Sequence, residues 1–347
     1  MARRDYRQFS MVDALLGSGR RKQARLDRLR EIHELIAWDT IDALLAAINS
    51  AHKGADGYPP LCLFKALLLS IWYNLSDAKL EEALADRLSF RKFCCFPLDA
   101  QTPDETTFVR FRKTLRERKL FDDLFAAIGQ QLDKQGLFVK QGTLIDATIV
   151  EADAKRPPVS EGEISTIDPD AGFTKKNGES YFGYKMHVGV DEGSTLIRQV
   201  EGTTADINDC LVFKGLVSGD ETFVCADKAY GSQDHRNWLL EHGIADRLMY
   251  KAQKNKPLVN WQVWFNKSVA ITRSGVERIF GVGKRSYGLG RARYRGIERV
   301  RAHFFMIAMA YNLRRAVTIV APRDGLAART TRGLCLDCNK SHLKPMI

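Results

Sequence analysis

Three acidic residues stand where a carboxylate is unfavourable unless it binds a cation. Asp146 interrupts the apolar run TLIDATIV, Asp227 ends the segment TFVCAD, and Glu277 lies in the basic stretch SGVERIFGVGKRSYGLGRARYRG. An ionised carboxylate inside a strand is costly unless it is paired with a base or a metal ion. Mg²⁺ prefers oxygen ligands, and two ions held about 3.5–4 Å apart can catalyse in-line phosphoryl transfer. The three acids are therefore candidate ligands of a divalent-metal site.

These acids can converge only if a sheet brings them together. Asp227 follows a predicted strand at its carboxyl end, where open α/β sheets place their ligands. Two aspartates on strands and one acid on a later helix would meet at one edge of that sheet. Each acid also has a structural interpretation that stays open. Asp146 could end a strand in a turn, and Asp227 could cap the loop before the next helix. Glu277 could pair with Arg273.

Positive charge is concentrated after Glu277, and the whole chain carries a formal charge of +11 with a pI near 9.3. Charge of this size favours polyanionic partners such as nucleic acid. At about 100° per residue, Arg273, Glu277 and Lys284 fall in one stripe of a helix, beside its apolar face. The arginines of the following loop alternate, so an extended chain would project them to one side. We expect phosphate contacts from this stripe and loop: Arg273, Lys284, Arg285, Arg291, Arg293 and Arg295. The alternative is a solvated basic loop.

Aromatic and further basic residues extend this prediction. Tyr287 and Tyr294 could stack on an unpaired base of a bound nucleic acid. Lys228 and His235, which follow the second aspartate, could touch phosphate. His187 is expected to be an ordinary strand residue with a satisfied hydrogen bond.

Strand and helix patterns alternate from about residue 140. Runs of period two predict a three-stranded meander in QGTLIDATIVEA, GYKMHVGVDE and LIRQVEGTT, and later strands in TFVCADKAY and ADRLMY. Helices are predicted in NDCLVFKGLV, in SQDHRNWLLEHG, and over about 270–285 and 298–320. Strands that alternate with helices after a meander indicate an α/β sheet covered by helices. The stretch between ADRLMY and the glutamate helix is too short for a large β insertion.

The N-terminal part has helical periodicity only. Residues 20–50 are predicted as helix, and PLCLFKALLLSIWYNL as a largely buried helix after a Gly/Pro break. In TPDETTFVRFRKTLRER we expect Thr102 to cap, Pro103 to take the first helical position and Glu105 to complete a capping box. The basic residues of that helix are Arg110, Lys113 and Arg116. They belong either to a helix-turn-helix-like DNA contact or to the solvated face of an ordinary amphipathic helix.

Neither a membrane span nor a disulfide framework is predicted. The longest apolar run, FFMIAMAY, is far shorter than the roughly 20 residues that span a bilayer. No apolar signal-peptide core follows the Arg-rich N-terminus. Seven cysteines form no even framework, so we expect a reduced, cytosolic compartment. The tail offers Cys335, Cys338 and His342 as zinc ligands, but structural zinc usually takes four. A loose terminal segment is the simpler interpretation.

The motifs together resemble a known family. DATIVEA, YFGYKMHVGVD, TTADINDC, CADKAYGS and RSGVERIFGVGKRSYGLGRARYRG are similar, in this order, to motifs of DDE transposases of the insertion-sequence-five type, within the insertion-sequence-four-like superfamily. The segment from YPPLCLFKALLLS to FVRFRKTL resembles the N-terminal domain of that group. The resemblance covers about residues 35–318. The superfamily signature Tyr-x2-Arg-x3-Glu-x6-Lys is matched by Arg273, Glu277 and Lys284, with Ala270 at the Tyr position.

The resemblance implies a ribonuclease-H-like mixed sheet flanked by helices, preceded by an all-helical DNA-binding region. It implies cleavage at transposon ends and joining of 3′-hydroxyl ends to target DNA, with two Mg²⁺ ions per active site and Mn²⁺ as a substitute. Residue by residue, it makes Asp146, Asp227 and Glu277 the catalytic metal ligands. The implied partners are double-stranded DNA, both terminal inverted repeats and target, and a second copy of the chain in the DNA complex.

The expected organisation has four parts: a basic arm over 1–35, a helical DNA-binding domain over 36–120, a catalytic domain over 138–320 and a flexible tail over 321–347. We expect a cytoplasmic, nucleoid-associated bacterial enzyme with no membrane partner. Two alternatives stay open. One is a ribonuclease-H-like DNA nuclease without strand transfer, and the other is a catalytically inactive, domesticated DNA-binding relic. The intact acid triad disfavours the relic.

Overall fold

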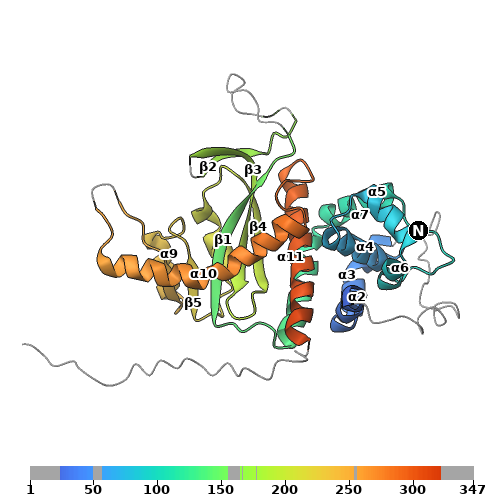
Figure 1. Cartoon of the computed structure of the whole chain (residues 1–347), viewed down its shortest axis with the longest axis horizontal. Coiled ribbons are helices and arrows are strands. Elements are labelled where there is room, and N and C mark those ends of the chain that lie inside the picture. Colours follow the sequence, from blue (N-terminus) through green and yellow to red (C-terminus); the bar gives the residue numbers. More distant parts are fainter. Residues whose placement is uncertain are drawn as a thin grey trace, which may run out of the picture.

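A helical N-terminal region and an α/β region make up the molecule (Figure 1). The computed structural model describes residues 24–49, 57–154, 165, 167–176, 178–253 and 256–321. The basic run GRRKQARLDRLR begins before the first described residue. The tail that carries Cys335, Cys338 and His342 follows the last one. The prediction for the N-terminal arm therefore lies outside the described residues up to residue 23, and so does the prediction for the zinc ligands of the tail.

Six strands form one mixed sheet: β1 (Gly142–Glu151), β2 (Gly172–Lys176), β3 (Glu179–Asp191), β4 (Ile197–Thr204), β5 (Phe223–Ala226) and β6 (Ala245–Leu248). Their order is β2-β3-β1-β5-β6, and β4 also pairs with β3. The pairs within the predicted meander, β1 with β3 and β3 with β4, are antiparallel, whereas β5 and β6 continue the sheet in parallel with β1. A mixed sheet of this kind between helices confirms the predicted ribonuclease-H-like fold class. The short strand β2 was not predicted.

The sheet separates two apolar cores. Four helices cover its faces: η3 (Asp209–Leu216), α9 (Gln233–Glu241), α10 (Asn260–Ser286) and α11 (Ile297–Val320). Leu144 packs in the core with α10 and α11, whereas its neighbour Ile145 packs in the core with η3 and α9. This alternation follows from the period of two of a strand buried on both faces. Gly202 on β4 allows α11 to approach closely, because a Cβ there would lie 2.7 Å from Cγ of Arg301.

The N-terminal region is helical throughout its described part: α2 (Ala24–Leu35), α3 (Trp38–Leu45), η1 (Ala46–Asn49), α4 (Pro60–Trp72), α5 (Asp77–Asp86), α6 (Leu88–Cys94), α7 (Glu105–Glu117) and α8 (Leu120–Lys134). The predicted start of α7 was wrong, because Asp104 caps it instead of Thr102. The Asp104 carboxylate accepts the N–H of Thr107 at 2.8 Å, and a negative charge is favourable at this end of a helix. Glu105 does not complete a capping box, because it is the first residue of this helix and not the third, and its own N–H donates to Glu81 at 2.8 Å.

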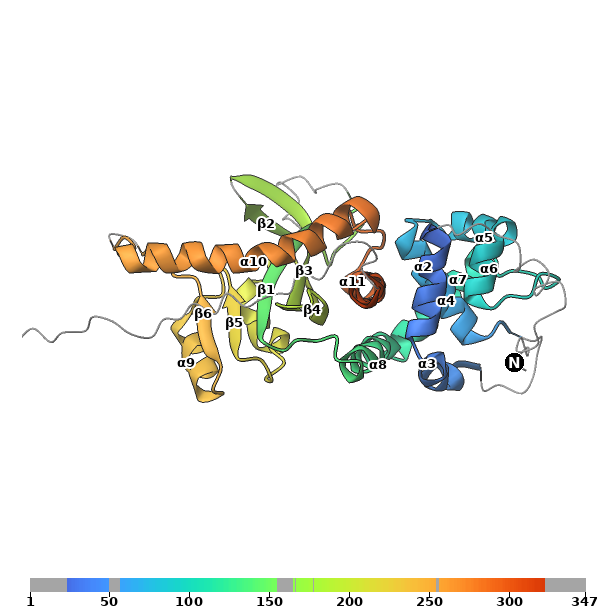
Figure 2. The same ribbon diagram turned by 60° about the horizontal axis from the view of Figure 1, so that its bottom comes forward.

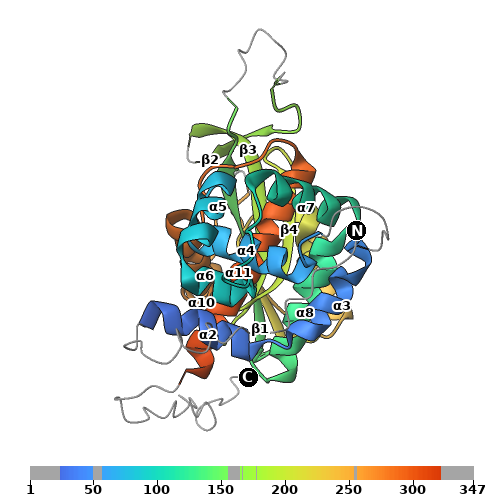
Figure 3. The same ribbon diagram turned by 90° about the vertical axis from the view of Figure 1, so that its right-hand side faces the viewer.

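Helix α11 is the common core element of the two regions. It lies between the sheet and the N-terminal helices, which cross it when seen from their side (Figures 2 and 3). The indole of Trp72 donates to the carbonyl of Ala310 at 2.8 Å, and Asn312 bonds both backbone groups of Ile197 at 2.8 and 2.7 Å. A helix packed on both sides is apolar around its circumference, which explains the run FFMIAMAY. None of the helices in the described ranges is long and apolar enough to span a bilayer.

Helix boundaries depart from the predictions in three places. The helix expected over 20–50 is broken after Leu35, and a second helix starts at Trp38. Helix α10 begins at Asn260, about ten residues before the predicted start, and α8 was not predicted at all. No strand occurs between β6 and α10 among the described residues, which agrees with the expected lack of a β insertion.

Candidate active site

The strand register places two of the predicted acids next to each other. In the parallel pair β1 and β5, Ile145 is the partner of Ala226. Asp146 is the next residue of β1, in the middle of that strand, and Asp227 directly follows the end of β5, so the two aspartates lie side by side on neighbouring strands. Asp227 is close enough for its charge to raise the pKa of Asp146. The sheet therefore brings these two carboxylates together as the sequence predicted.

Both aspartates lie toward the sheet face that α10 covers. Leu144 and Cys225, two residues earlier on each strand, belong to the core beneath this helix. Side chains two apart on a strand share a face, so Asp146 projects the same way as Leu144. Gly275 of α10 lies directly over Leu144, because a Cβ on this glycine would meet its Cδ1 at 3.4 Å.

Glu277 is carried by the same helix but is exposed to solvent. The predicted apolar face of α10, formed by Val276, Ile279 and Phe280, is buried against the sheet as expected. In the described parts of the chain, no three His, Cys, Asp or Glu side chains lie close enough together to hold a metal ion. The carboxylate of Glu277 is therefore not gathered with the two aspartates in this conformation.

Arg273 forms an ion pair with Asp146, one of the carboxylates that a metal ion would need. Its Nη2 lies 2.9 Å from Oδ2 of Asp146, and the two side chains are only 16% and 21% exposed. Burial raises the pKa of Asp146, and the opposing charge of Arg273 is the main effect that lowers it. The sequence had offered Glu277 as the partner of this arginine, and the structure pairs it with Asp146 instead.

The guanidinium of Arg273 is incompletely satisfied. Its Nε is buried without a hydrogen-bond partner, and its Nη1 contacts only the sulfur of Met249 at 3.7 Å. An arginine stays charged and presents five donors. Arg273 therefore keeps its charge while its guanidinium is not fully hydrogen-bonded inside the protein.

The donor set around the aspartates suits a hard divalent cation. One oxygen of each carboxylate accepts a backbone N–H, from Ala147 to Asp146 at 2.9 Å and from Ala229 to Asp227 at 2.6 Å. Hydrogen bonds of this type orient metal-binding carboxylates. Oxygen donors held beside each other match the preference of Mg²⁺ and Mn²⁺. The residues present fit the predicted ion, with Glu277 supplying a third carboxylate only after its side chain moves.

Several predicted phosphate contacts are exposed around this site. Lys228 directly follows Asp227 and is exposed, as are Lys284 and Arg285 at the end of α10. Burial and the nearby charge of Lys176 lower the pKa of Lys284. Arg291 and Arg295 are 65% and 51% exposed, and each lies 3.3 Å from a different carboxylate oxygen of Asp153. Because these ion pairs with Asp153 are exposed to solvent, they are weak, and they leave Arg291 and Arg295 able to bind a polyanion.

Two members of the predicted basic surface have other roles. The Tyr287 ring is 2% exposed, so the prediction that it stacks on an unpaired base is wrong for this conformation. Arg293 turns to the N-terminal region, where its Nη1 donates to the Leu75 carbonyl at 2.9 Å and its Nη2 donates to the Asn74 side chain. Residues 291–296 form no strand, and the three arginines therefore do not project to one side.

Two histidines near the site are structural. His235 is 8% exposed and stacks on Phe213 at 4.2 Å between ring centroids. The prediction that it touches phosphate is therefore wrong for this conformation. His187 is buried, and its Nε2 lies 2.9 Å from the hydroxyl of Thr203, as the strand pattern suggested.

The basic residues predicted on α7 lie in the N-terminal region, away from the two aspartates. Arg110 and Lys113 are exposed, whereas Arg116 is half-buried. Arg112 was not singled out from the sequence, yet it forms a two-point ion pair with Asp77 at 2.8 and 2.5 Å. No local signal distinguishes Arg112 from the other arginines of this helix, because its partner belongs to another helix.

A mixed sheet that sets one aspartate in the middle of β1 beside another just after β5 is an α/β arrangement suited to metal-dependent phosphoryl transfer. Two transposase families match separate parts of the chain. The transposase DDE domain family matches residues 137–313, and a transposase domain family (DUF772) matches residues 18–114. The first match covers more than half of the 347 residues, so the protein belongs to the DDE transposase family.

One solved structure is similar across most of the chain. It is a cryo-EM structure of the piggyBac transposase synaptic complex with hairpin DNA. The similarity extends over 88% of this chain and 85% of that chain, at 10% sequence identity and a TM-score of 0.41. The family matches, rather than this remote likeness, identify the protein as a DDE transposase.

Proposed function

We propose that this chain is a transposase of the insertion-sequence-five type, which cleaves DNA at transposon ends and joins the 3′-hydroxyl ends to target DNA. The observation that supports this most directly is the register of β1 and β5, which sets Asp146 beside Asp227 under the helix that carries Glu277. Two Mg²⁺ or Mn²⁺ ions, held by these three acids, would activate the attacking oxygen and stabilise the leaving oxygen.

The residues of the chain prepare the site for a DNA strand. Arg273, with its unpartnered Nε, would exchange Asp146 for a phosphate of the bound strand. That exchange frees the aspartate carboxylate, and Glu277, already exposed, rotates toward it. Lys284 and Arg285 at the end of the same helix would hold neighbouring phosphates.

The proposed division of labour follows the two regions. The helical region, over about 36–120, would recognise the terminal inverted repeats, with Arg110, Lys113 and Arg116 among its contacts. The catalytic domain would extend over about 138–320. A homodimer in the DNA complex would hold two transposon ends together, and the enzyme would act on the nucleoid in the cytoplasm.

The test is a cleavage assay with DNA that carries the ends flanking the gene. Wild type, Glu277→Gln and a matched control, Glu241→Gln on the exposed end of α9, are compared in Mg²⁺ and Mn²⁺ on a sequencing gel. Metal-dependent nicks and joined products in wild type and control, both lost in Glu277→Gln, are expected. Cleavage without joining would indicate the nuclease, and binding without cleavage the DNA-binding relic. Cleavage that survives in Glu277→Gln would refute the assignment of this acid.

A further inference from the structure

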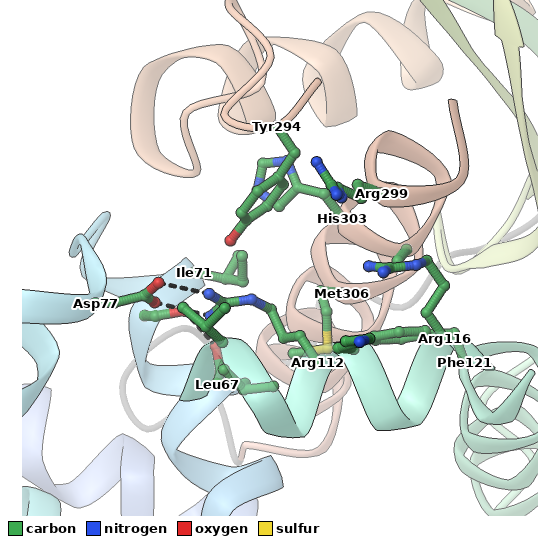
Figure 4. Close-up of a pocket in the computed structure, with 14 residues that line it drawn as sticks. Leu67, Ile71, Asp77, Arg112, Arg116, Phe121, Tyr294, Arg299, His303 and Met306 are labelled. Atoms are coloured by element: carbon green, nitrogen blue, oxygen red, sulfur yellow. Dashed lines mark hydrogen bonds and ion pairs between the residues drawn. The ribbon is translucent and has the colours of Figure 1, made fainter. Parts of the chain in front are cut away.

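A cavity of about 370 Å³ lies at the junction of the two regions, between α4, α7, α11 and the loop before α11 (Figure 4). Its apolar wall is formed by Leu67, Ile71, Phe121 and Met306. The volume is in the range of pockets that bind small organic ligands. None of its lining residues comes from β1, β5 or α10, so it is separate from the acidic site.

Two guanidinium groups at this cavity have no acidic partner. Arg116 from α7 and Arg299 from α11 both line it and are labelled in the close-up (Figure 4). In the described ranges neither forms an ion pair, whereas Arg112, which also lines the cavity, is paired with Asp77. Guanidinium groups bind phosphate or carboxylate through charge-assisted hydrogen bonds. The cavity therefore combines an apolar wall with a site for one anionic group.

A buried histidine supplies an independent sign of a missing ligand. His303 lines the cavity, is 5% exposed, and its Nε2 has no hydrogen-bond partner. Burial, together with the nearby charges of Arg293 and Arg112, lowers its pKa to about 3, so the ring is neutral at physiological pH. Tyr294 stands edge-on to this ring at 5.4 Å between centroids. Buried polar atoms are nearly always paired, and a bound molecule with a polar edge would pair this one.

We propose that the cavity binds a nucleoside phosphate, with the base between the apolar wall and the pair Tyr294 and His303, and the phosphate on Arg116 and Arg299. A base provides an apolar face and a hydrogen-bonding edge, and it is attached to an anion, so it matches all three features. The choice of a nucleotide over other amphipathic anions rests on the proposed DNA function. The nucleotide is either an unstacked residue of a DNA strand or a free mononucleotide.

The test measures nucleotide binding by the whole chain. The probes are 2-aminopurine deoxyriboside 5′-phosphate, free in solution, and the same nucleotide within a short single strand, each followed by fluorescence. Arg299→Gln and Arg116→Gln each remove one anion contact. Ala302→Phe fills the cavity from α11 without changing charge. Lys92→Gln, an exposed lysine of α6, is the matched control for the loss of one charge. Thermal unfolding verifies that every variant is folded.

Wild type is expected to bind at least one probe, and each arginine variant to weaken binding by about tenfold, the loss expected for one charge-assisted hydrogen bond. Ala302→Phe should weaken binding as well, and Lys92→Gln should leave it unchanged. Binding of the strand alone identifies DNA as the source, and binding of the free probe identifies a mononucleotide.

Three outcomes would overturn the proposal. They are no binding of either probe by wild type, unchanged binding by Ala302→Phe, and equal weakening by Lys92→Gln, which would indicate general attraction of polyanions. Failure of this proposal is distinguishable from failure of the proposed function. If nucleotide binding is retained but transposon ends are not cleaved, the cavity proposal stands and the transposase proposal falls. If transposon ends are cleaved but neither nucleotide probe binds, the transposase proposal stands and the cavity proposal falls.

Discussion

Two buried basic side chains, one in each region of the molecule, are accommodated in opposite ways. In the α/β region, Arg273 is paired with Asp146 at 2.9 Å. In the N-terminal region, Lys65 on α4 is 1% exposed and forms no ion pair with a described carboxylate. The Lys65 Nζ lies 3.1 Å from Nδ1 of His33, 3.7 Å from Sγ of Cys95, and 4.3 Å from the centroid of a Trp38 ring.

The difference separates a replaceable contact from a structural one. Arginine cannot lose its proton in a protein, so burial obliges it to keep an anion beside it. That anion can be exchanged for a phosphate. Burial instead lowers the pKa of Lys65, which reduces the cost of burying its charge. We therefore expect Arg273 to affect activity and Lys65 to affect stability alone.

The largest expected effect is on the acid pair beside Arg273. Asp227→Asn should lower the rate of strand cleavage by about 10³-fold or more, because it removes one metal-binding charge. The change keeps the Oδ1 that accepts the N–H of Ala229, so the free energy of unfolding should change by less than about 1 kcal/mol. Cleavage rates in Mg²⁺ and urea unfolding measure the two quantities. Asp99→Asn, an exposed acid of the N-terminal region, is the control, and cleavage within tenfold of wild type would contradict the assignment.

The second effect tests whether Arg273 blocks the site at rest. Arg273→Gln should lower cleavage by about 30-fold, within the range for losing one charge-assisted contact to a phosphate. The same change should tighten Mn²⁺ binding to the protein without DNA, because Asp146 loses its ion-pair partner. Electron paramagnetic resonance of Mn²⁺ measures this directly. Arg278→Gln, an exposed position on the same helix, should change neither quantity. Unchanged or weaker Mn²⁺ binding in Arg273→Gln would show that the ion pair does not compete with metal.

The third effect concerns stability alone. Lys65→Met should raise the free energy of unfolding by about 1–2 kcal/mol at pH 7, because an apolar side chain of similar length avoids the burial of an amine. Urea unfolding gives the value, with Lys79→Met on the exposed side of α5 as control. Cleavage of DNA should be unchanged. A loss of stability would mean that the contacts of Lys65 with His33 and Trp38 outweigh its burial.

The smallest effect is a dependence of stability on pH. The pKa of Lys65 is lowered in the folded protein, whereas an unfolded lysine has a pKa of about 10.4. Between these two values the unfolded state binds more protons, so stability rises with pH by at most about 1.4 kcal/mol per unit from this group. Unfolding of wild type and Lys65→Met across alkaline pH should show a smaller positive slope in the variant. Equal slopes would show that Lys65 does not titrate in this window.

The local sequence pattern was sufficient to predict the strands that carry the two aspartates. The meander strands have a period of two, and Asp146 and Asp227 stand out because each interrupts or ends an apolar run. Their meeting at one place in the sheet was expected from the sequence, but the register of β1 and β5 brings it about, since Asp146 lies in the middle of β1 and Asp227 just after β5. The apolar face of α10 was predictable for the same reason, because helical spacing alone places Val276, Ile279 and Phe280 together.

The local sequence pattern could not predict the contacts of side chains whose partners lie far away in the sequence. Tyr287 and Arg293 have the composition of a DNA-binding loop, yet one is buried and the other bonds Asn74 and Leu75. The ion pair between Arg273 and Asp146, like that between Arg112 and Asp77, joins different elements of the fold. Nothing in the spacing of either arginine indicates its partner.

The sequence by itself determined the α/β alternation, the helical N-terminal region and the identity of the candidate acids, because period and residue type act over a few neighbouring positions. Tertiary structure alone decided where Arg273 points, that Glu277 stands apart from the aspartates, and that a cavity forms between α7 and α11. These features depend on how helices far apart in the chain pack on one sheet. Packing of that kind is set by the shape and charge of whole surfaces, which no short stretch of sequence contains.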